Sequence, residues 1–86
     1  MESRLQARII RDLKKRGYIP VKIIRCNLDG FPDILALKNR VAVFIEVKDK
    51  GRKARPLQLW RHQELKAEKF DCYVIDNWEE YEKLKL

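Results

Sequence analysis

The sequence has few of the residues that small specialised domains depend on. Of its 86 residues two are cysteines, three are glycines and one is a histidine. Cys26 and Cys72 have no second cysteine or histidine at ligand spacing, which argues against a cysteine-based zinc site. Both lie in apolar, strand-like segments, so we expect buried free thiols in a reducing cytosol.

The chain also lacks long apolar runs, internal repeats and low-complexity segments. No stretch approaches the length of a transmembrane helix, and the first residues lack the apolar core of a secretory signal. No linker divides the chain, so we expect one domain over residues 1–86. We expect that domain to be cytoplasmic and to have no membrane partner.

Positive charge is what the sequence has in excess. The formal net charge is +7 and the sequence pI is about 9.7. Such a balance suits a polyanionic partner, of which nucleic acid is the commonest. A membrane surface would instead require a long basic amphipathic helix with a wide apolar face, and none is evident. The hydrophobic fraction of 45% allows a modest core, which an oligomer would extend.

Hydrophobic periodicity and turn residues divide the chain into seven elements. In chain order these are a helix over 2–16, a strand over 18–26, strands over 33–38 and 40–48, a helix from Pro56 toward Phe70, a strand over 72–75 and a last helix capped by Asp76 or Asn77. The order α-β-β-β-α-β-α predicts an α/β fold with a mixed sheet flanked by helices.

The two central strands can be placed in register. If a tight turn is centred on residues 39–40, Asp33 lies opposite Glu46. Because side chains alternate along a strand, both carboxylates then point to one otherwise apolar face of the sheet, and Lys48 joins them. The same register pairs Leu35 with Phe44 and Leu37 with Ala42.

Two carboxylates facing each other on such a surface repel, and removing them from water adds to the cost. A divalent cation between them would turn the repulsion into ligation, and Mg²⁺ or Mn²⁺ prefers hard oxygen ligands of this kind. Lys48 would then stand beside the cation, where it could hold a phosphate oxygen or orient the attacking water. The alternative is a plain ion pair between Lys48 and one acid, with no metal.

In this order and spacing the motifs are similar to those of a known nuclease superfamily. The segment 30–33 (Gly-Phe-Pro-Asp), the segment 46–48 (Glu-Val-Lys) on the next strand, and then Gly51 and Gln58 resemble the PD-(D/E)xK nucleases. Within that superfamily the chain resembles a stand-alone VRR-NUC (virus-type replication-repair nuclease) domain. The resemblance extends from Glu2 to the strand that contains Val74.

The resemblance implies a restriction-endonuclease-like core, in which a helix, three antiparallel strands, a second helix and one further strand follow one another. It also implies Mg²⁺ or Mn²⁺ bound by Asp33, Glu46 and the backbone carbonyl of Val47. Lys48 would be the catalytic lysine, and Gln58 would support the site. By the same analogy the source is a phage or prophage, which would place the protein in the host cell cytoplasm.

Several neighbouring residues have both a functional and a structural interpretation. Glu2 stands where the family has a glutamate in its first helix, so it either completes the metal shell or only complements the helix dipole. Gln58 follows Pro56 at a helix start, which would aim it at the site. A group of basic side chains would either contact DNA phosphates without reading sequence or form a plain solvated surface. These are Lys50, Arg52, Lys53, Arg55 and Arg61.

For the aromatic residues and the histidine we favour structural roles. Trp60 could stack on a base, but a lone aromatic residue on an amphipathic helix is more often core. We expect His62 at the surface of a polar helix, since this class of nuclease needs no histidine. Trp78 and Tyr81 are expected to pin the last helix to the sheet.

Together these features predict a metal-dependent endonuclease that hydrolyses DNA phosphodiester bonds and uses no nucleotide cofactor. With no recognition helix visible, selectivity for DNA shape is more plausible than base readout. A homodimer would present paired sites to two strands, which fits branched DNA such as a four-way Holliday junction. The alternatives are a non-catalytic nucleic-acid-binding module and an interaction subunit of a phage or repair assembly.

Overall fold

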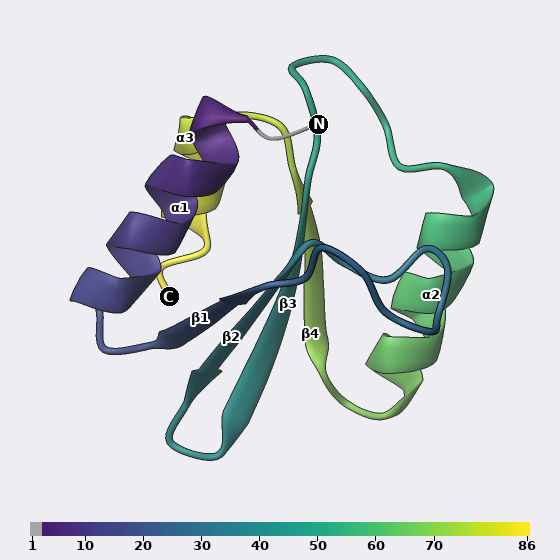
Figure 1. Cartoon of the computed structure of the whole chain (residues 1–86), viewed down its shortest axis with the longest axis horizontal. Coiled ribbons are helices and arrows are strands. Elements are labelled where there is room, and N and C mark those ends of the chain that lie inside the picture. Colours follow the sequence, from purple (N-terminus) through teal and green to yellow (C-terminus); the bar gives the residue numbers. More distant parts are fainter. Residues whose placement is uncertain (1–2) are drawn as a thin grey trace.

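The computed structural model describes residues 3–86, and its elements follow the predicted order (Figure 1). They are α1 (Arg4–Lys15), β1 (Ile19–Lys22), β2 (Ile34–Lys38), β3 (Val41–Val47), α2 (Pro56–Ala67), β4 (Asp71–Ile75) and α3 (Trp78–Lys83).

The sheet is mixed, as predicted, with the strand order β1-β2-β3-β4. The first three strands pair antiparallel, whereas β4 runs parallel to β3. Asn39 and Arg40 both have a left-handed backbone, with φ of 48° and 69°, which is the conformation of a two-residue hairpin turn. The predicted register is confirmed by the pairing of Leu35 with Phe44 and of Leu37 with Ala42.

The first strand is shorter than the predicted range of 18–26. Its last backbone bond to β2 runs from the amide of Ile23 to the carbonyl of Asp33, at 2.7 Å. In the same register Ile24 would lie opposite Pro32 as a non-hydrogen-bonded pair, and β1 ends before it, at Lys22. Between Ile23 and Asp33 the chain leaves the sheet and runs beside α2 (Figure 1).

The main core lies between the sheet and the pair α1 and α3, which cover one face together (Figure 1). Its residues are buried, apolar and drawn from both layers: Ile9, Leu13, Ile34, Ala36, Val43, Ile45, Ile75 and Tyr81. Ser3 caps α1 by accepting a hydrogen bond from the amide of Gln6 at 3.0 Å.

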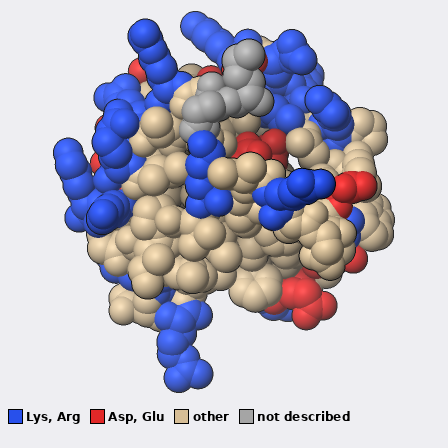
Figure 2. Space-filling view, viewed as in Figure 1, with Lys and Arg blue, Asp and Glu red and all other residues tan. Residues whose placement is uncertain are grey.

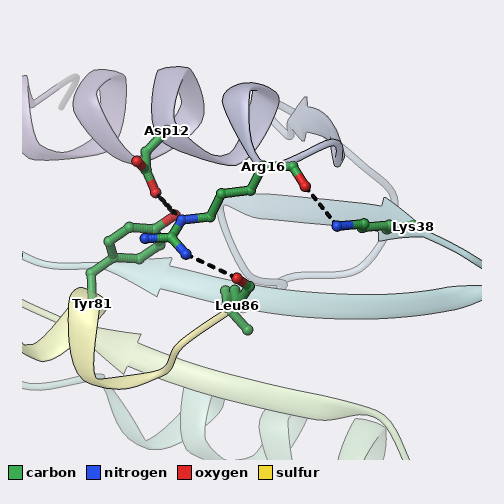
Figure 3. Close-up of polar contacts among 5 residues, drawn as sticks. All are labelled: Asp12, Arg16, Lys38, Tyr81 and Leu86. Atoms are coloured by element: carbon green, nitrogen blue, oxygen red, sulfur yellow. Dashed lines mark hydrogen bonds and ion pairs between the residues drawn. The ribbon is translucent and has the colours of Figure 1, made fainter.

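A polar network closes the edge of this core (Figure 3). The Tyr81 hydroxyl donates to Asp12 Oδ2 at 2.7 Å, and Arg16 Nε donates to the same oxygen at 2.6 Å. Arg16 also donates to the carbonyl of Leu86, while Lys38 Nζ donates to the carbonyl of Arg16. Tyr81 thus packs over the sheet, as predicted, and in addition ties α3 to α1.

Helix α2 covers the opposite face, on the side of β3 and β4 (Figure 1). An edge-to-face series of rings fills part of this layer, with Phe44 lying 5.5 Å from both Phe31 and Phe70. Cys72 is buried there, as predicted.

Two residues that were predicted to be buried are exposed. Cys26 is exposed, because β1 ends before it and the segment 23–33 has left the sheet. Trp60 is 56% exposed, because it lies on the outer side of α2. No helix in the described range 3–86 is long and apolar enough to cross a membrane.

Candidate active site

The ends of two strands bring an acidic pair and a lysine to the α2 face of the sheet. β2 begins at Ile34, which pairs with Ile45. One step further along this register Asp33 faces Glu46, and Lys48 follows two residues later on the same face. The hairpin register therefore places these three side chains together at one end of the sheet.

Asp33 is fixed by the backbone around it. Its Oδ2 accepts a hydrogen bond from the amide of Val47 at 2.9 Å, so the carboxylate bridges from the start of β2 to the end of β3. Gly30 lets the preceding segment approach α2, since its φ is +77° and a Cβ there would lie 3.0 Å from Leu57. The segment 30–33 is thus held between the sheet and the start of α2.

Glu46 is the most unusual side chain of the site, since it is a carboxylate only 2% exposed. Its Oε2 accepts a hydrogen bond from Gln58 Nε2 at 3.0 Å and lies 3.3 Å from Lys48 Nζ. Its Oε1 is buried and has no hydrogen-bond partner among residues 3–86. Burial, followed by the nearby charge of Asp33, raises the pKa of Glu46 to about 7, although Lys48 opposes the shift.

Gln58 is oriented by the helix start, as the sequence predicted. Pro56 opens α2, and Gln58 Oε1 accepts a hydrogen bond from the amide of Arg55 at 2.8 Å. With the oxygen held by the cap, the amide nitrogen of Gln58 is directed at Glu46. Both ends of this side chain are therefore used, one in folding the helix and one in the site.

This donor set fits a hard divalent cation. Two carboxylates lie side by side, and one buried oxygen of Glu46 lacks a partner in the described part of the chain. Unpaired carboxylate oxygens of this kind are ligands that Mg²⁺ and Mn²⁺ accept. The pair has no third member, because residues 3–86 contain no cluster of three or more His, Cys, Asp or Glu side chains that could hold a metal. Glu2, the further predicted ligand, lies outside the described residues.

His62 is where the sequence prediction fails at the site. It was expected at the surface, but it is 4% exposed and is the buried residue of α2. It lies one turn beyond Gln58, so both side chains face the sheet. Burial, with a further contribution from Lys66, lowers its pKa, while the charge of Asp33 opposes the shift. The four-residue spacing from Gln58 was the signal that could have revealed this position.

The predicted basic residues do not all lie together. A pocket of about 310 Å³ next to Val47 and Lys48 is lined by Asp49, Arg52, Lys53 and Arg55, but not by Lys50. Arg61 lies elsewhere, where it donates to the carbonyl of Asp29 at 3.1 Å and to Glu64 at 2.7 Å.

Figure 2 shows how this charge is spread over one face of the molecule. Lys and Arg side chains crowd its upper half, over α1 and over the segment between β3 and α2, with acidic atoms visible in a recess between them. Asp33 itself lines a second pocket of about 250 Å³, together with residues between Ile23 and Phe31. One pocket therefore includes Asp33, and the other includes Lys48.

Comparison with known proteins gives similarities in sequence and in structure. No model of a known protein family matches the chain. The chain is 31% identical over 77 residues to a protein described as "Putative nuclease p44" of Acyrthosiphon pisum secondary endosymbiont phage 1. The aligned residues cover 88% of this chain and 83% of that protein. A solved structure described as a VRR_NUC domain is similar with a TM-score of 0.85 and 28% identity, covering 94% of this chain and 89% of that one.

Proposed function

This chain belongs to the VRR-NUC family of nucleases, and from that premise we propose that it is a metal-dependent endonuclease that hydrolyses phosphodiester bonds of DNA. The observation that carries the proposal is the acidic pair at the end of the β2–β3 hairpin. Glu46 is buried beside Asp33 with one oxygen unsatisfied in the described chain, an arrangement that destabilises a fold unless something binds there.

The proposed cation, Mg²⁺ or Mn²⁺, would be held by Asp33, Glu46 and the carbonyl of Val47, with Glu2 as a further candidate. When bound, it supplies Lewis-acid chemistry, activating water and stabilising negative charge on the phosphate. The buried Oε1 of Glu46 supports this assignment, since it faces no donor of the described chain. The direction of the pKa shift supports it too, because a neighbouring cation would relieve the repulsion between the two carboxylates.

Lys48 and Gln58 act around this pair. The Lys48 side chain is 16% exposed and its ammonium lies 3.3 Å from Glu46 Oε2, so it brings positive charge to the place where a scissile phosphate would lie. A preorganised charge of this kind stabilises the transition state because it needs no reorganisation during the reaction. Gln58 holds Glu46 Oε2 by a 3.0 Å hydrogen bond and so orients the carboxylate.

The DNA strand is proposed to cross the acidic pair from one pocket to the other. Arg52, Lys53 and Arg55 face the pocket beside Lys48, where they would hold backbone phosphates next to the scissile one. Lys50 lies outside the lining of that pocket and would act only through long-range attraction. Arg61 is engaged with Asp29 and Glu64, which supports a structural role for it in place of the DNA contact expected from sequence.

We further propose that the protein acts as a homodimer on branched DNA, such as a four-way junction. β1 is an edge strand whose Ile19 and Val21 are exposed, and an apolar edge of this kind is commonly covered in a functional assembly. A two-fold dimer would present one site to each of two strands.

The test is cleavage of linear, flapped and four-way-junction DNA by the purified protein in Mg²⁺, Mn²⁺ or EDTA. We expect cutting in either metal, none in EDTA, and a preference for the junction. Asp33→Ala should abolish cleavage and leave DNA binding intact.

Several results would contradict the proposal. Cleavage that persists in EDTA would refute the metal dependence. Junction binding by a wild-type protein that never cuts would instead support the alternative of a non-catalytic binding module. A protein that neither cuts nor binds DNA across a range of salt concentrations would support the alternative of an interaction subunit. Sedimentation of the free protein as a monomer at working concentration would refute the dimer.

A further inference from the structure

The proposed chemistry leaves one buried polar side chain of α2 without a role. His62 is 4% exposed, and its Nε2 is buried without a hydrogen-bond partner within residues 3–86. A buried polar atom left unsatisfied destabilises a protein, whereas a leucine of similar size would not. Packing alone therefore does not explain why this position carries an imidazole.

The neighbours of His62 belong to the acidic site. The charges of Asp33 and Lys48 both reach the ring strongly enough to affect its pKa. Gln58, one turn earlier on the same side of α2, donates to Glu46 Oε2. α2 thus directs two polar side chains, four residues apart, at the end of the sheet where Asp33 and Glu46 meet.

The unsatisfied atoms are also grouped. Within the described chain, the buried side-chain atoms without partners are Glu46 Oε1 and His62 Nε2. Gln58 donates to Glu46, and His62 stands one turn beyond Gln58 on the same side of α2, so both unsatisfied atoms belong to the layer between α2 and the sheet. Two polar atoms left open in this layer indicate room for groups that the described chain does not supply.

We propose that His62 is a positioning residue of this site, whose Nε2 hydrogen-bonds an oxygen at the reacting centre, either of a water molecule or of a DNA phosphate. The inference rests on the proposed nuclease function and extends it to a residue that the sequence assigned to the surface. Burial lowers the pKa of the His62 ring and so favours its uncharged form, which can hold this oxygen without adding a charge.

Nuclear magnetic resonance can test the proposal without relying on activity. The chain contains a single histidine, so a tag-free, ¹⁵N-labelled protein gives one pair of imidazole nitrogen signals. We expect the Nε2 signal to shift when the oxygen partner arrives. A shift with Mg²⁺ alone identifies water, and a shift with junction DNA in EDTA identifies a phosphate oxygen. The proposal is overturned if the Nε2 signal stays in place with Mg²⁺ alone, with junction DNA in EDTA, and with Mg²⁺ and DNA together in the Asp33→Ala variant.

Two substitutions provide the second measurement. His62→Leu removes the unsatisfied atom, so its thermal unfolding midpoint should equal or exceed that of the wild type. Its kcat should nevertheless fall by about 10- to 100-fold, the usual loss when a supporting group of a metal site is removed, with KM for DNA nearly unchanged. His62→Gln keeps a polar end at a similar reach and should recover part of the lost rate. Gln63→Leu, at the exposed neighbouring position, is the matched control and should change neither property.

The outcomes separate this inference from the function on which it rests. If the wild type cuts and His62→Leu cuts within threefold of it, the inference fails and the nuclease stands. If both His62 variants lose activity only in proportion to a lowered unfolding midpoint, the role is structural and the inference again fails. If the wild type never cuts, the proposed function fails, and the nuclear magnetic resonance arms alone decide whether His62 meets an oxygen ligand.

Discussion

The two faces of the sheet have opposite characters. The face under α1 and α3 is a closed apolar layer, in which Ile34, Ala36 and Ile45 are completely buried. The face under α2 buries Glu46 and His62 and leaves one polar atom of each without a partner among the described residues. The first face stabilises the fold, and the second carries a local destabilisation of the kind that functional sites retain.

The helices that cover these faces differ in the same way. α1 buries Ile9 and Leu13 against the sheet, and the Tyr81–Asp12 hydrogen bond closes its edge. α2 buries His62 and exposes about half of each of its outer apolar side chains, namely Leu57, Leu59 and Trp60. α2 is therefore positioned as much by its polar contacts to the site as by hydrophobic burial.

The largest effect on cleavage should come from removing the charge of Glu46, on the α2 face. Glu46→Gln keeps the shape of the side chain but removes the charge that a cation would bind. Cleavage should fall by on the order of 10³-fold, comparable to losing a major electrostatic group of an active site. The unfolding free energy in EDTA at pH 8 should rise, because a buried charge near Asp33 is gone. Loss of both activity and stability would contradict the proposed contrast between the faces.

Truncating a core side chain on the α1–α3 face should lower the unfolding free energy instead of raising it. Ile45→Ala removes a completely buried side chain from the apolar layer and should lower the unfolding free energy by about 2–5 kcal/mol. Leu35→Ala, at a half-buried position on the α2 face, should lower it less. Urea unfolding measures both values. Equal losses would show that the two faces contribute alike to stability.

The pH dependence of stability should report Glu46 directly. In EDTA its folded-state pKa of about 7 lies above the ordinary value of 4.5, so folding favours the protonated form. This stabilisation is fully present below pH 4.5 and is lost as the pH rises toward 7, by about 3 kcal/mol in total. Urea titrations between pH 4 and 8 should show the unfolding free energy falling with pH in the wild type and not in Glu46→Gln. If Mg²⁺ binds at Glu46, its presence should flatten this dependence on pH.

A smaller loss of unfolding free energy is expected when the hydrogen bond that ties α3 to α1 is removed. Tyr81→Phe removes the 2.7 Å hydrogen bond to Asp12, which is the main reason that the pKa of Asp12 is lowered. The unfolding free energy should fall by about 1–2 kcal/mol, and cleavage per folded molecule should stay at the wild-type value. A variant that is stable but slower in cleavage would mean that this side also contributes to the site.

The smallest effect should come from a single basic residue of the pocket beside Lys48. Lys53→Ala removes one phosphate contact, so DNA binding should weaken modestly, and the slope of log affinity against log salt should fall by about 1. Lys15→Ala, at an exposed position of α1, is the matched charge control. Fluorescence anisotropy at several salt concentrations checks both. Identical slopes for the two variants would contradict the assignment of the pocket to DNA.

Much of the site could be derived from the sequence because it depends on local chemistry. The turn at Asn39 and Arg40 fixes the hairpin register, and the period of two along each strand then brings Asp33, Glu46 and Lys48 to one face. Gln58 was placed by the same kind of argument, since Pro56 fixes where α2 begins. These relations connect residues within a short stretch of chain, so their geometry follows from backbone rules alone.

The sequence by itself determined the order of the elements, the hairpin register and the excess of positive charge. Only the tertiary structure decided that His62 is buried, that Trp60 and Cys26 are exposed and that Arg61 is engaged by Asp29 and Glu64. For His62, Trp60 and Arg61 the physical reason is that α2 has no clear apolar stripe, so its periodicity does not reveal which side meets the sheet. Contacts with distant parts of the chain set that rotation, and with it which polar side chains reach the site.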